Sequence, residues 1–406
     1  MKVLQINAVS GISSTGRTCS ELSDYLNNNG YEGYVAYSAG IPYHKGYKIG
    51  SSFDAKMHGL YSRIFGTQAY FSKNATRKLL TYISDLQPDV VHLRNLHSNY
   101  INLKMLLNYL AANDIPTVIT LHDCWFYTGK CTHYTVDNCY KWQTGCGGCP
   151  RLKQDNPSWF FDRTPIMLQD KKDWLQQIPR LAVVGVSDWI TDEARKSFLS
   201  SAKVLTRIYN WIDLDVFKPV DGSAVRQKLG ITDKYAVLGI ASGWSNRKGL
   251  DKFIELSNII PPEMIIVLVG GLSSNINFPD NIIHIPETHN AAELAEYYSM
   301  ADVYVHLSQE ETFGKVIAEA LSCGTPAIVL NSTACPEIVD SSCGMVLSDH
   351  QPRTILDAVM AIKEKGKRYY SESAIIFVNN NFNKGDLIEK TIELYKDLYS
   401  KEVGSR

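Results

Sequence analysis

Short apolar runs alternate with polar, helix-patterned stretches along almost the whole chain. Runs rich in aliphatic and β-branched residues indicate buried strands, because both faces of a strand in a parallel sheet are covered. The predicted strands are 2–9, 34–37, 89–93, 116–121, 181–186, 235–241, 265–269, 282–285, 303–307 and 327–330. Helices are predicted at 19–28, between the third and fourth strands, at 291–300 and at 385–400. This alternation predicts an α/β fold with parallel sheets.

Length and charge divide the chain into two parts. Its 406 residues exceed what one hydrophobic core usually covers and suit two domains. The net charge of −1 conceals an asymmetry: residues 1–207 carry 23 Lys and Arg against 16 Asp and Glu, and residues 208–406 carry 18 against 26. The basic half is expected to meet an anionic surface or ligand, unless the asymmetry is chance. No nucleic-acid partner is expected.

The N-terminus resembles a core strand more than an export signal. Gln5 and Asn7 interrupt its apolar run, no small-residue cleavage site follows, and no stretch of about 18 apolar residues exists that would span a membrane. We therefore expect a cytoplasmic protein, in which the nine cysteines are thiols or metal ligands rather than disulfides.

The stretch after the strand at 303–307 has the composition of an anion site. A helix is predicted to begin near Gly314 and to end at a Gly-Thr-Pro sequence. Its first amide groups suit a phosphate, and Lys315 adds a cation beside them. Glu311 and Glu319 flank this helix start, where they can bind hydroxyl groups on either side of a phosphate, such as those of a ribose and a sugar. The plain alternative is two surface glutamates.

Residues 311–326, Glu-Thr-Phe-Gly-x-x-x-x-Glu-Ala-Leu-x-x-Gly-Thr-Pro, carry a family resemblance. They resemble the donor-site signature of the family-4 retaining glycosyltransferases of the bacterial exopolysaccharide and capsule type. The resemblance implies a GT-B fold, in which two Rossmann-like domains face each other across a cleft. It implies that Glu311 acts in catalysis beside the transferred sugar. It also implies a set of donor-binding residues: Thr312, Phe313, Gly314, Lys315, Val316 and Glu319.

A second basic turn follows the strand at 235–241. The family commonly has Gly-Arg-x-x-x-x-Lys-Gly here, where a basic pair binds the donor diphosphate. Lys248 carries over from this pattern and Gly243 stands in the place of its first glycine, with three residues instead of four between Trp244, which stands where the arginine is usual, and Lys248. Arg247 is a displaced candidate for the missing cation. A solvated turn is the alternative.

The first half offers two further candidate groups. Gly16 and Arg17 lie in a loop predicted after the first strand, at the edge where such sheets bind ligands, and are candidates for an acceptor or phosphate contact. The loop matches no dinucleotide or Walker pattern, so a connecting turn is equally compatible. His122 follows the strand at 116–121, and the resemblance places a catalytic histidine near the transferred sugar at this point. A structural histidine is the alternative.

The other histidines have less context. His92, His97 and His306 lie in or next to predicted strands. No motif around them is comparable with that of His122, so none is assigned a role.

Five of the nine cysteines fall within residues 124–149. Cys146 and Cys149 have the spacing of a zinc knuckle, and Cys131 and Cys139 could complete four thiolate ligands. The segment lacks regular periodicity and is expected to have little core of its own, so a structural zinc would stabilise it. His133 and Cys124 are possible substitute ligands, and free thiols or a redox pair are the alternatives.

The predicted domain limits follow from these motifs. Residues 1–207 form an N-terminal acceptor domain with a cysteine-rich insertion at about 124–150. Residues 208–222 form a linker that resembles the family's Asn-Gly-Ile-Asp…Phe-x-Pro segment, with Trp211 in place of the glycine. Residues 223–384 form the nucleotide-sugar domain, and a helix in 385–406 returns to the first domain.

The predicted activity is transfer of a sugar from a nucleotide-sugar donor to a glycan or lipid-linked acceptor, with retention of configuration. The enzyme would be a hexosyltransferase-type protein of surface polysaccharide biosynthesis that needs no catalytic metal. A nucleotide-sugar epimerase of the same fold and a non-enzymatic, zinc-stabilised interaction module remain open. A nicotinamide oxidoreductase is disfavoured, because the dinucleotide fingerprint is missing.

The first domain is also predicted to attach to the inner membrane surface. Its net charge of +7 favours anionic headgroups. The candidate contacts are Arg63, Lys73, Arg77 and Lys78, interleaved with Tyr61, Phe65, Tyr70 and Phe71. The same aromatic residues could instead pack inside the domain.

Overall fold

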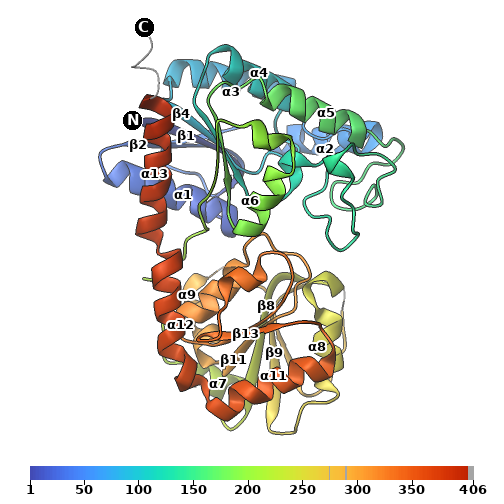
Figure 1. Cartoon of the computed structure of the whole chain (residues 1–406), viewed down its shortest axis with the longest axis vertical. Coiled ribbons are helices and arrows are strands. Elements are labelled where there is room, and N and C mark those ends of the chain that lie inside the picture. The colour runs from blue at the N-terminus through green and yellow to red at the C-terminus, as the bar shows by residue number, and fades with distance from the viewer. Residues whose placement is uncertain (274, 289, 401–406) are drawn as a thin grey trace. The chain divides into compact units, whose positions relative to one another are not determined.

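The computed structural model describes residues 1–273, 275–288 and 290–400, and divides the chain into two compact units (Figure 1). The first unit comprises Met1–Ile208 and the C-terminal segment from Ile388, and the second comprises Tyr209–Leu387. Each unit is built on one parallel sheet with its own core, which is the architecture of two Rossmann-like domains.

The first unit has a seven-stranded sheet in the order β3-β2-β1-β4-β5-β6-β7. The strands are β1 (Lys2–Ser10), β2 (Glu32–Gly40), β3 (Gly46–Lys48), β4 (Val90–Leu93), β5 (Thr117–Leu121), β6 (Leu181–Gly185) and β7 (Val204–Arg207). The central strand β1 pairs in parallel with both β2 and β4, so that Leu4 lies opposite Tyr34 on one side and Val91 on the other. Fully buried aliphatic side chains of these central strands form the core.

Helices surround this sheet. They are α1 (Ser13–Asn28), α2 (Ser52–Phe65), α3 (Lys73–Leu86), α4 (Leu103–Ala112), α5 (Thr164–Leu175) and α6 (Asp188–Arg195). Ser187 caps the start of α6, because its hydroxyl accepts the Ile190 amide hydrogen at 3.2 Å. The C-terminal helix α13 (Lys384–Ser400) lies beside α1 in Figure 1, and Tyr25 of α1 donates a hydrogen bond to Glu389 of α13.

The second unit has a six-stranded sheet in the order β10-β9-β8-β11-β12-β13. The strands are β8 (Tyr235–Trp244), β9 (Met264–Leu272), β10 (Ile282–Ile285), β11 (Val303–His306), β12 (Ala327–Leu330) and β13 (Gly344–Leu347). The helices are α7 (Ser223–Leu229), α8 (Leu250–Ser257), α9 (Ala291–Met300), α10 (Lys315–Ser322), α11 (Pro352–Lys365) and α12 (Lys367–Phe382). The strand order reverses between β8 and β11, and ligands of such sheets bind at the carboxyl ends of the strands flanking that point.

The elements predicted from the sequence are present, with one instructive error. The helix predicted from residue 19 begins at Ser13, so that Gly16 and Arg17 belong to α1 and not to a loop. Ile12 provides no side-chain cap, and the Ser and Thr residues that follow are weak helix formers, so no local signal marks this start. Packing decides it, because Gly16, Thr18 and Cys19 are buried in the fold.

None of the helices in the described residues combines the length and the hydrophobicity that a membrane span requires.

Candidate active site

The candidate site of the second unit lies where β8 and β11 end. β11 ends at His306, and the chain loops back to begin α10 at Lys315. Gly314 caps this helix with φ +86°, and a Cβ there would lie 2.7 Å from the Ile317 side chain, so a glycine is needed. Beside this loop, a single 3₁₀ turn after β8 carries Arg247 and Lys248.

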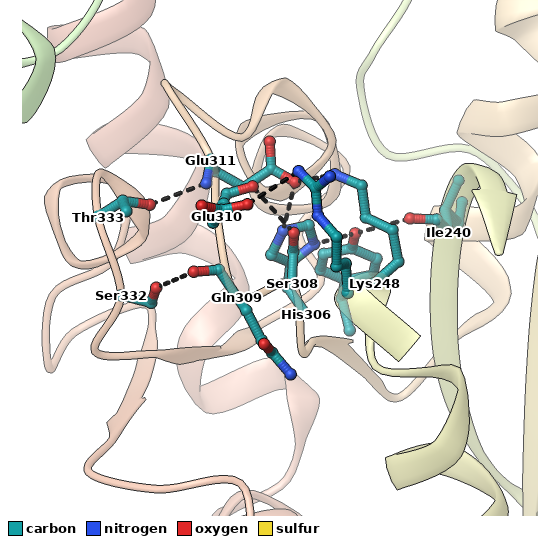
Figure 2. A network of polar contacts seen from close by, with 11 residues as sticks. Ile240, Lys248, His306, Ser308, Gln309, Glu310, Glu311, Ser332 and Thr333 are labelled. Carbon is teal, nitrogen blue, oxygen red and sulfur yellow. Dashed lines mark hydrogen bonds and ion pairs between the residues drawn. The ribbon is translucent and has the colours of Figure 1, made fainter. Parts of the chain in front are cut away.

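Three charged or polar side chains meet at this edge (Figure 2). The Lys248 Nζ donates to the Glu311 Oε1 at 2.5 Å, and the His306 Nε2 lies 3.2 Å from the same oxygen. The His306 Nδ1 lies 3.1 Å from the Tyr304 hydroxyl. The His306 Nε2–H donates to the carboxylate, and the Tyr304 hydroxyl beside Nδ1 donates to the Ile240 carbonyl at 3.5 Å.

The charge on Glu311 is held in place by these neighbours. Burial by itself would raise the pKa of this carboxyl, but the Lys248 ammonium and the His306 hydrogen bond outweigh burial and hold the pKa well below its usual value. Glu311 is therefore an ionised carboxylate at neutral pH. Its side chain is 17% exposed, so it can still meet a ligand.

The loop that presents Glu311 is fixed by its own hydrogen bonds. The Glu311 amide donates to the Thr333 hydroxyl at 2.8 Å, and the Ser332 hydroxyl donates to the Gln309 carbonyl (Figure 2). The Gln309 amide in turn donates to the Arg247 carbonyl at 2.9 Å. The segment after β12 and the turn after β8 thus hold the loop from two sides.

Arg247 forms the second ion pair of the site. Its Nη2 lies 2.8 Å from the Oε2 of Glu310, a buried carboxylate, while the guanidinium is 38% exposed. Trp244, which stands where the family commonly has arginine, is in the core, because β8 extends through it and its indole packs edge-on against Phe253. Arg247 and Lys248 are therefore the cations that this turn presents, and Gly243 lies exposed beside them.

The remaining predicted donor-binding residues differ in how accessible their side chains are to a ligand. Phe313 is buried and packs edge-on against Phe382, and Thr312 is also buried, so these two side chains support the loop. Lys315 and Val316 are partly exposed, so the first turn of α10 can be reached by a ligand. At that turn the amide groups and the helix dipole favour an anion.

Glu319 is placed differently from Glu311. Its side chain is only 2% exposed, and its Oε2 accepts a hydrogen bond from the Tyr298 hydroxyl at 3.1 Å. In this conformation the carboxylate is satisfied inside the unit, between α9 and α10. Its predicted contact with a ribose stays a prediction.

His306 is the member of the site that the sequence reasoning missed. No motif assigns it a role, but the structure places its Nε2 3.2 Å from the Glu311 carboxylate. The signal was available: His306 ends a parallel strand in the same way as His122, and that position faces the ligand-binding edge.

In the first unit, His122 is held by a buried arginine. The Arg94 Nη1 lies 3.1 Å from the His122 Nε2, and the Arg94 Nε donates to the Gln5 Oε1 at 2.8 Å. A guanidinium can only donate, so Nε2 is the acceptor and the proton of a neutral ring is on Nδ1. Arg94 and Gln5 are fully buried and were not predicted as site residues.

His97 also gains a partner that the sequence reasoning did not predict. Its Nε2 lies 2.9 Å from the Asp123 Oδ2. Burial would raise the pKa of Asp123, but His97 and the Trp125 amide outweigh it and lower the pKa. Asp123 is therefore a fixed anion next to His122.

Gly16 and Arg17, the predicted acceptor or phosphate contacts, lie inside the first turns of α1. Gly16 is buried against β1, where a Cβ would lie 3.1 Å from Val9, so its role is close packing of helix and strand. Arg17 is partly exposed. A contact between Arg17 and an anion stays a prediction.

The cysteine-rich insertion has more core than the sequence suggested. Tyr127, Tyr134 and Trp142 are buried and pack against one another with ring centroids 5.0–6.4 Å apart. The expectation of little core was wrong, because aromatic residues without regular spacing form a cluster that no periodicity reveals. Cys131, Cys139, Cys146 and Cys149 line one pocket in this segment. In the described residues, no three His, Cys, Asp or Glu side chains are already arranged as metal ligands.

Comparison with known families agrees with the geometry of both units. Residues 15–216 match the model described as Glycosyltransferase Family 4, and residues 222–375 match the model described as Glycosyl transferases group 1. The chain belongs to glycosyltransferase family 4. It is thus a transferase, and the Glu311 site lies in the part matched by the second model.

Curated relatives include glycosyltransferases of bacteria. The chain is 26% identical over 300 residues to the glycosyl transferase WcaC of Escherichia coli (strain K12), named for colanic acid biosynthesis, with 71% of each protein covered. It is 26% identical over 158 residues to a D-inositol 3-phosphate glycosyltransferase of Mycolicibacterium gilvum (strain PYR-GCK), with 36% of each covered.

Solved structures share the fold. HepE of Anabaena, solved with UDP and glucose, superposes with a TM-score of 0.68 at 17% identity, covering 98% of this chain and 100% of HepE. Sucrose-phosphate synthase of Thermosynechococcus elongatus gives a TM-score of 0.71 at 15% identity, covering 99% and 100%. The chain therefore has the GT-B fold.

Proposed function

We propose that this glycosyltransferase moves a hexose from a nucleotide-sugar to a glycan or lipid-linked acceptor, with retention, during synthesis of a surface polysaccharide. The observation that carries the proposal is the Lys248–Glu311–His306 cluster beside the accessible start of α10. It combines cations, helix amides and one ionised carboxylate. WcaC and HepE support the proposal: the first is named for colanic acid biosynthesis, and the second was solved with UDP and glucose.

The cations and amides suit the leaving group. Breaking the glycosidic bond releases a nucleoside diphosphate, whose growing negative charge must be stabilised. Lys248 carries three N–H donors, one of which Glu311 engages, and Arg247 is partly exposed beside it. The amides at the start of α10 add fixed dipoles at no reorganisation cost. Diphosphate binding is therefore assigned to Lys248, Arg247 and the first turn of α10.

Glu311 suits the sugar rather than the phosphate. The Glu311 carboxylate would repel a phosphate, whereas sugar hydroxyls can donate hydrogen bonds to it. Its negative charge also stabilises the positive charge that develops on the sugar ring. Because Lys248 and His306 already contact Glu311, we assign it to binding and electrostatic stabilisation and not to nucleophilic attack.

A panel of nucleotide-sugars tests this proposal. The protein is incubated with each donor, with and without lipid-linked diphosphate acceptors, and free nucleotide and product are measured. We expect acceptor-dependent nucleotide release with one donor, and a product with the anomeric configuration of that donor in proton NMR. Conversion of a donor without any acceptor would indicate an epimerase instead, and an inverted product would contradict retention.

We also propose that the first unit binds an anionic membrane surface, where a lipid-linked acceptor would be found. Exposed aromatic side chains of α2 and of the loop at 158–161 support this proposal: Tyr61, Phe65, Trp159, Phe160 and Phe161. These two segments are neighbours, because the Trp159 amide donates to the Arg63 carbonyl at 2.7 Å. The exposed Lys73, Arg77 and Lys78 begin the next helix. Tyr70, in contrast, packs inward and donates to Asp170 at 2.6 Å.

Vesicle sedimentation tests the membrane proposal. Binding is expected to require anionic lipid, to fade as salt screens the charges, and to fall in Trp159→Ser/Phe160→Ser. Tyr369→Ser removes an equally exposed aromatic side chain from the second unit and serves as the control. Equal binding by both variants, or no sedimentation of the wild type at low salt, would contradict the proposal.

A further inference from the structure

Four cysteines from separate parts of the insertion surround one small pocket. Cys131, Cys139, Cys146 and Cys149 all line it, together with the buried rings of Tyr134 and Trp142. The cavity volume is about 20 Å³, which is room for a single ion or water molecule and for no organic ligand.

The backbone that carries these cysteines is already fixed. The Lys130 Nζ, next to Cys131, donates to the carbonyls of Arg151, Leu152 and Gln154 at 3.0–3.1 Å, just past Cys149. The Lys141 Nζ, close to Cys139, donates to the carbonyls of Gly147 and Gly148. Two lysine side chains thus tie the first pair of cysteines to the second pair.

The turn between Cys146 and Cys149 has the local geometry of a metal knuckle. Gly148 has φ +54°, a left-handed conformation that bends the turn sharply. The Gly129 backbone lies close to Cys146, because a Cβ added at Gly129 would be 3.1 Å from the Cys146 sulfur.

Two buried lysines lie at the pocket: Lys130 lines it, and Lys171 donates to the carbonyl of Thr128, which also lines it. Lys130 and Lys171 are each about 2% exposed, and backbone carbonyls hold both ammonium groups. The Lys171 Nζ also lies 3.6 Å from the centre of the Trp125 ring. Within the described residues neither lysine forms an ion pair with a carboxylate. Burial of a charge is costly unless an opposite charge compensates it.

We propose that Cys131, Cys139, Cys146 and Cys149 bind one zinc ion as four thiolates. Zinc with four thiolates carries a net charge of −2, which Lys130 and Lys171 balance. The four residues already share the pocket, and Lys130 and Lys141 tie together the backbone segments that carry them. The ion would be structural, since four protein ligands leave no open position for a substrate.

A dithiol pair is the competing interpretation of the same cysteines. Cys131 and Cys149 line the same pocket, as the two members of a redox pair would. A redox pair, however, uses only two sulfurs and gives no purpose to the convergence of Cys139 and Cys146 on the same pocket. The metal assignment explains all four positions.

Metal analysis of the full-length protein, purified without chelators or added zinc, tests the proposal. We expect about one zinc per chain in the wild type and in Cys343→Ser, a buried cysteine of the second unit, and little zinc in Cys131→Ser, Cys139→Ser, Cys146→Ser and Cys149→Ser. Cobalt exchanged into the wild type is expected to give the visible absorption of a tetrahedral thiolate site, which decides the matter even if the variants do not fold.

Three outcomes would overturn the proposal. The first is a wild-type protein that contains no zinc and takes up no cobalt, with its thiols reacting freely while it is folded. The second is a Cys131–Cys149 disulfide in the metal-free protein as isolated. The third is full zinc content in any of the four serine variants.

Discussion

The proposed donor site contains one carboxylate whose charge is controlled by two neighbours. Glu311 is largely buried, a condition that normally favours the neutral acid, yet the Lys248 ammonium and the His306 imidazole keep it ionised. A carboxylate in this setting stays ionised near neutral pH and can stabilise positive charge on a substrate. Its partner Lys248 gains a fixed orientation toward the start of α10 from the same contact.

Glu311→Gln should separate charge from shape at this position. The amide keeps the size of the side chain and the Thr333 contact of its backbone, but it cannot balance Lys248 or a cationic sugar. We expect turnover to fall by about 100-fold or more, with nucleotide affinity changed by less than about threefold. Steady-state kinetics and calorimetric titration with the nucleotide measure the two quantities.

Glu310→Gln is the matched control for this prediction. It removes the adjacent carboxylate, which pairs with Arg247 rather than Lys248. Its effect on turnover should be clearly smaller than that of Glu311→Gln. Turnover at the wild-type rate in Glu311→Gln, or a larger loss in Glu310→Gln, would contradict the assigned role.

Among the elements of the first unit, α2 and α3 are joined by a buried histidine. His58 of α2 lies with its Nδ1 2.7 Å from the hydroxyl of Ser72, which precedes α3, and its side chain is almost completely buried. Burial lowers the pKa of His58 from 6.5 to about 4. The folded protein therefore binds fewer protons at this site than the unfolded chain between these two pH values.

This difference predicts an acid-sensitive helix pair. Stability rises with pH wherever the unfolded state binds more protons, so the contribution of His58 is complete above pH 6.5 and is lost as the pH falls toward 4. The full loss is about 3 kcal/mol, on the order of 1.4 kcal/mol per pH unit. Urea unfolding of the wild type between pH 7 and pH 4.5 should show at least this slope, and His58→Gln should reduce it, leaving the part due to His92, whose pKa burial also lowers.

The exposed His44 provides the control for the acid-sensitivity prediction. His44→Gln should leave the pH dependence of unfolding as it is in the wild type. If His58→Gln and His44→Gln have the same slope as the wild type, the buried imidazole is not the origin of the acid sensitivity.

On the scale of the whole molecule, the last helix completes the first unit rather than the second. Tyr395 of α13 is fully buried, and its hydroxyl lies 2.6 Å from the Nδ1 of His92 in β4. The Nε2 of the same histidine contacts the Thr120 hydroxyl of β5 at 2.7 Å. Tyr395, near the C-terminus, thus belongs to a hydrogen-bond network that includes His92 in β4 and Thr120 in β5.

Tyr395→Phe should weaken the first unit selectively. The substitution leaves a buried histidine nitrogen without its partner, which costs about 1–3 kcal/mol. We expect the unfolding transition of the first unit to move to lower denaturant while that of the second stays in place. Tyr399→Phe changes an exposed tyrosine of the same helix and should shift neither transition. Equal shifts of both transitions would show that α13 does not belong to the first unit.

The sequence was informative wherever the physical cause is local. A strand buried on both faces must be apolar throughout, so the central strands could be placed from the sequence, with ends that differ by three residues or fewer. Gly314 marks the start of α10 because only glycine accepts its backbone conformation. The strands β3, β7 and β13 were missed, because these sheet-edge strands are partly exposed and lack a continuous run of buried residues.

The donor motif and its neighbours show which contacts could not be predicted from the sequence. The spacing of Glu311, Lys315 and Glu319 placed them around one helix start, but it did not show that Glu319 is satisfied by Tyr298 or that Glu311 contacts His306. Arg94 and Gln5 could not be predicted as site residues, because nothing in the sequence distinguishes buried, hydrogen-bonded polar side chains from polar side chains at the surface. The spacing of the four cysteines indicated a shared site, and the pocket places all four together.

The sequence by itself determined the α/β alternation, the two-part organisation and the motif at 311–326, since each depends on residues close together in the chain. The tertiary structure alone decided which distant groups meet. Lys248 and Glu311 are 63 residues apart, and His92 and Tyr395 are 303 apart. The first pair forms because β8 and β11 are neighbours in the sheet, and the second because α13 packs on the first unit. Strand order and packing are properties of the whole fold, and therefore no local pattern contains these contacts.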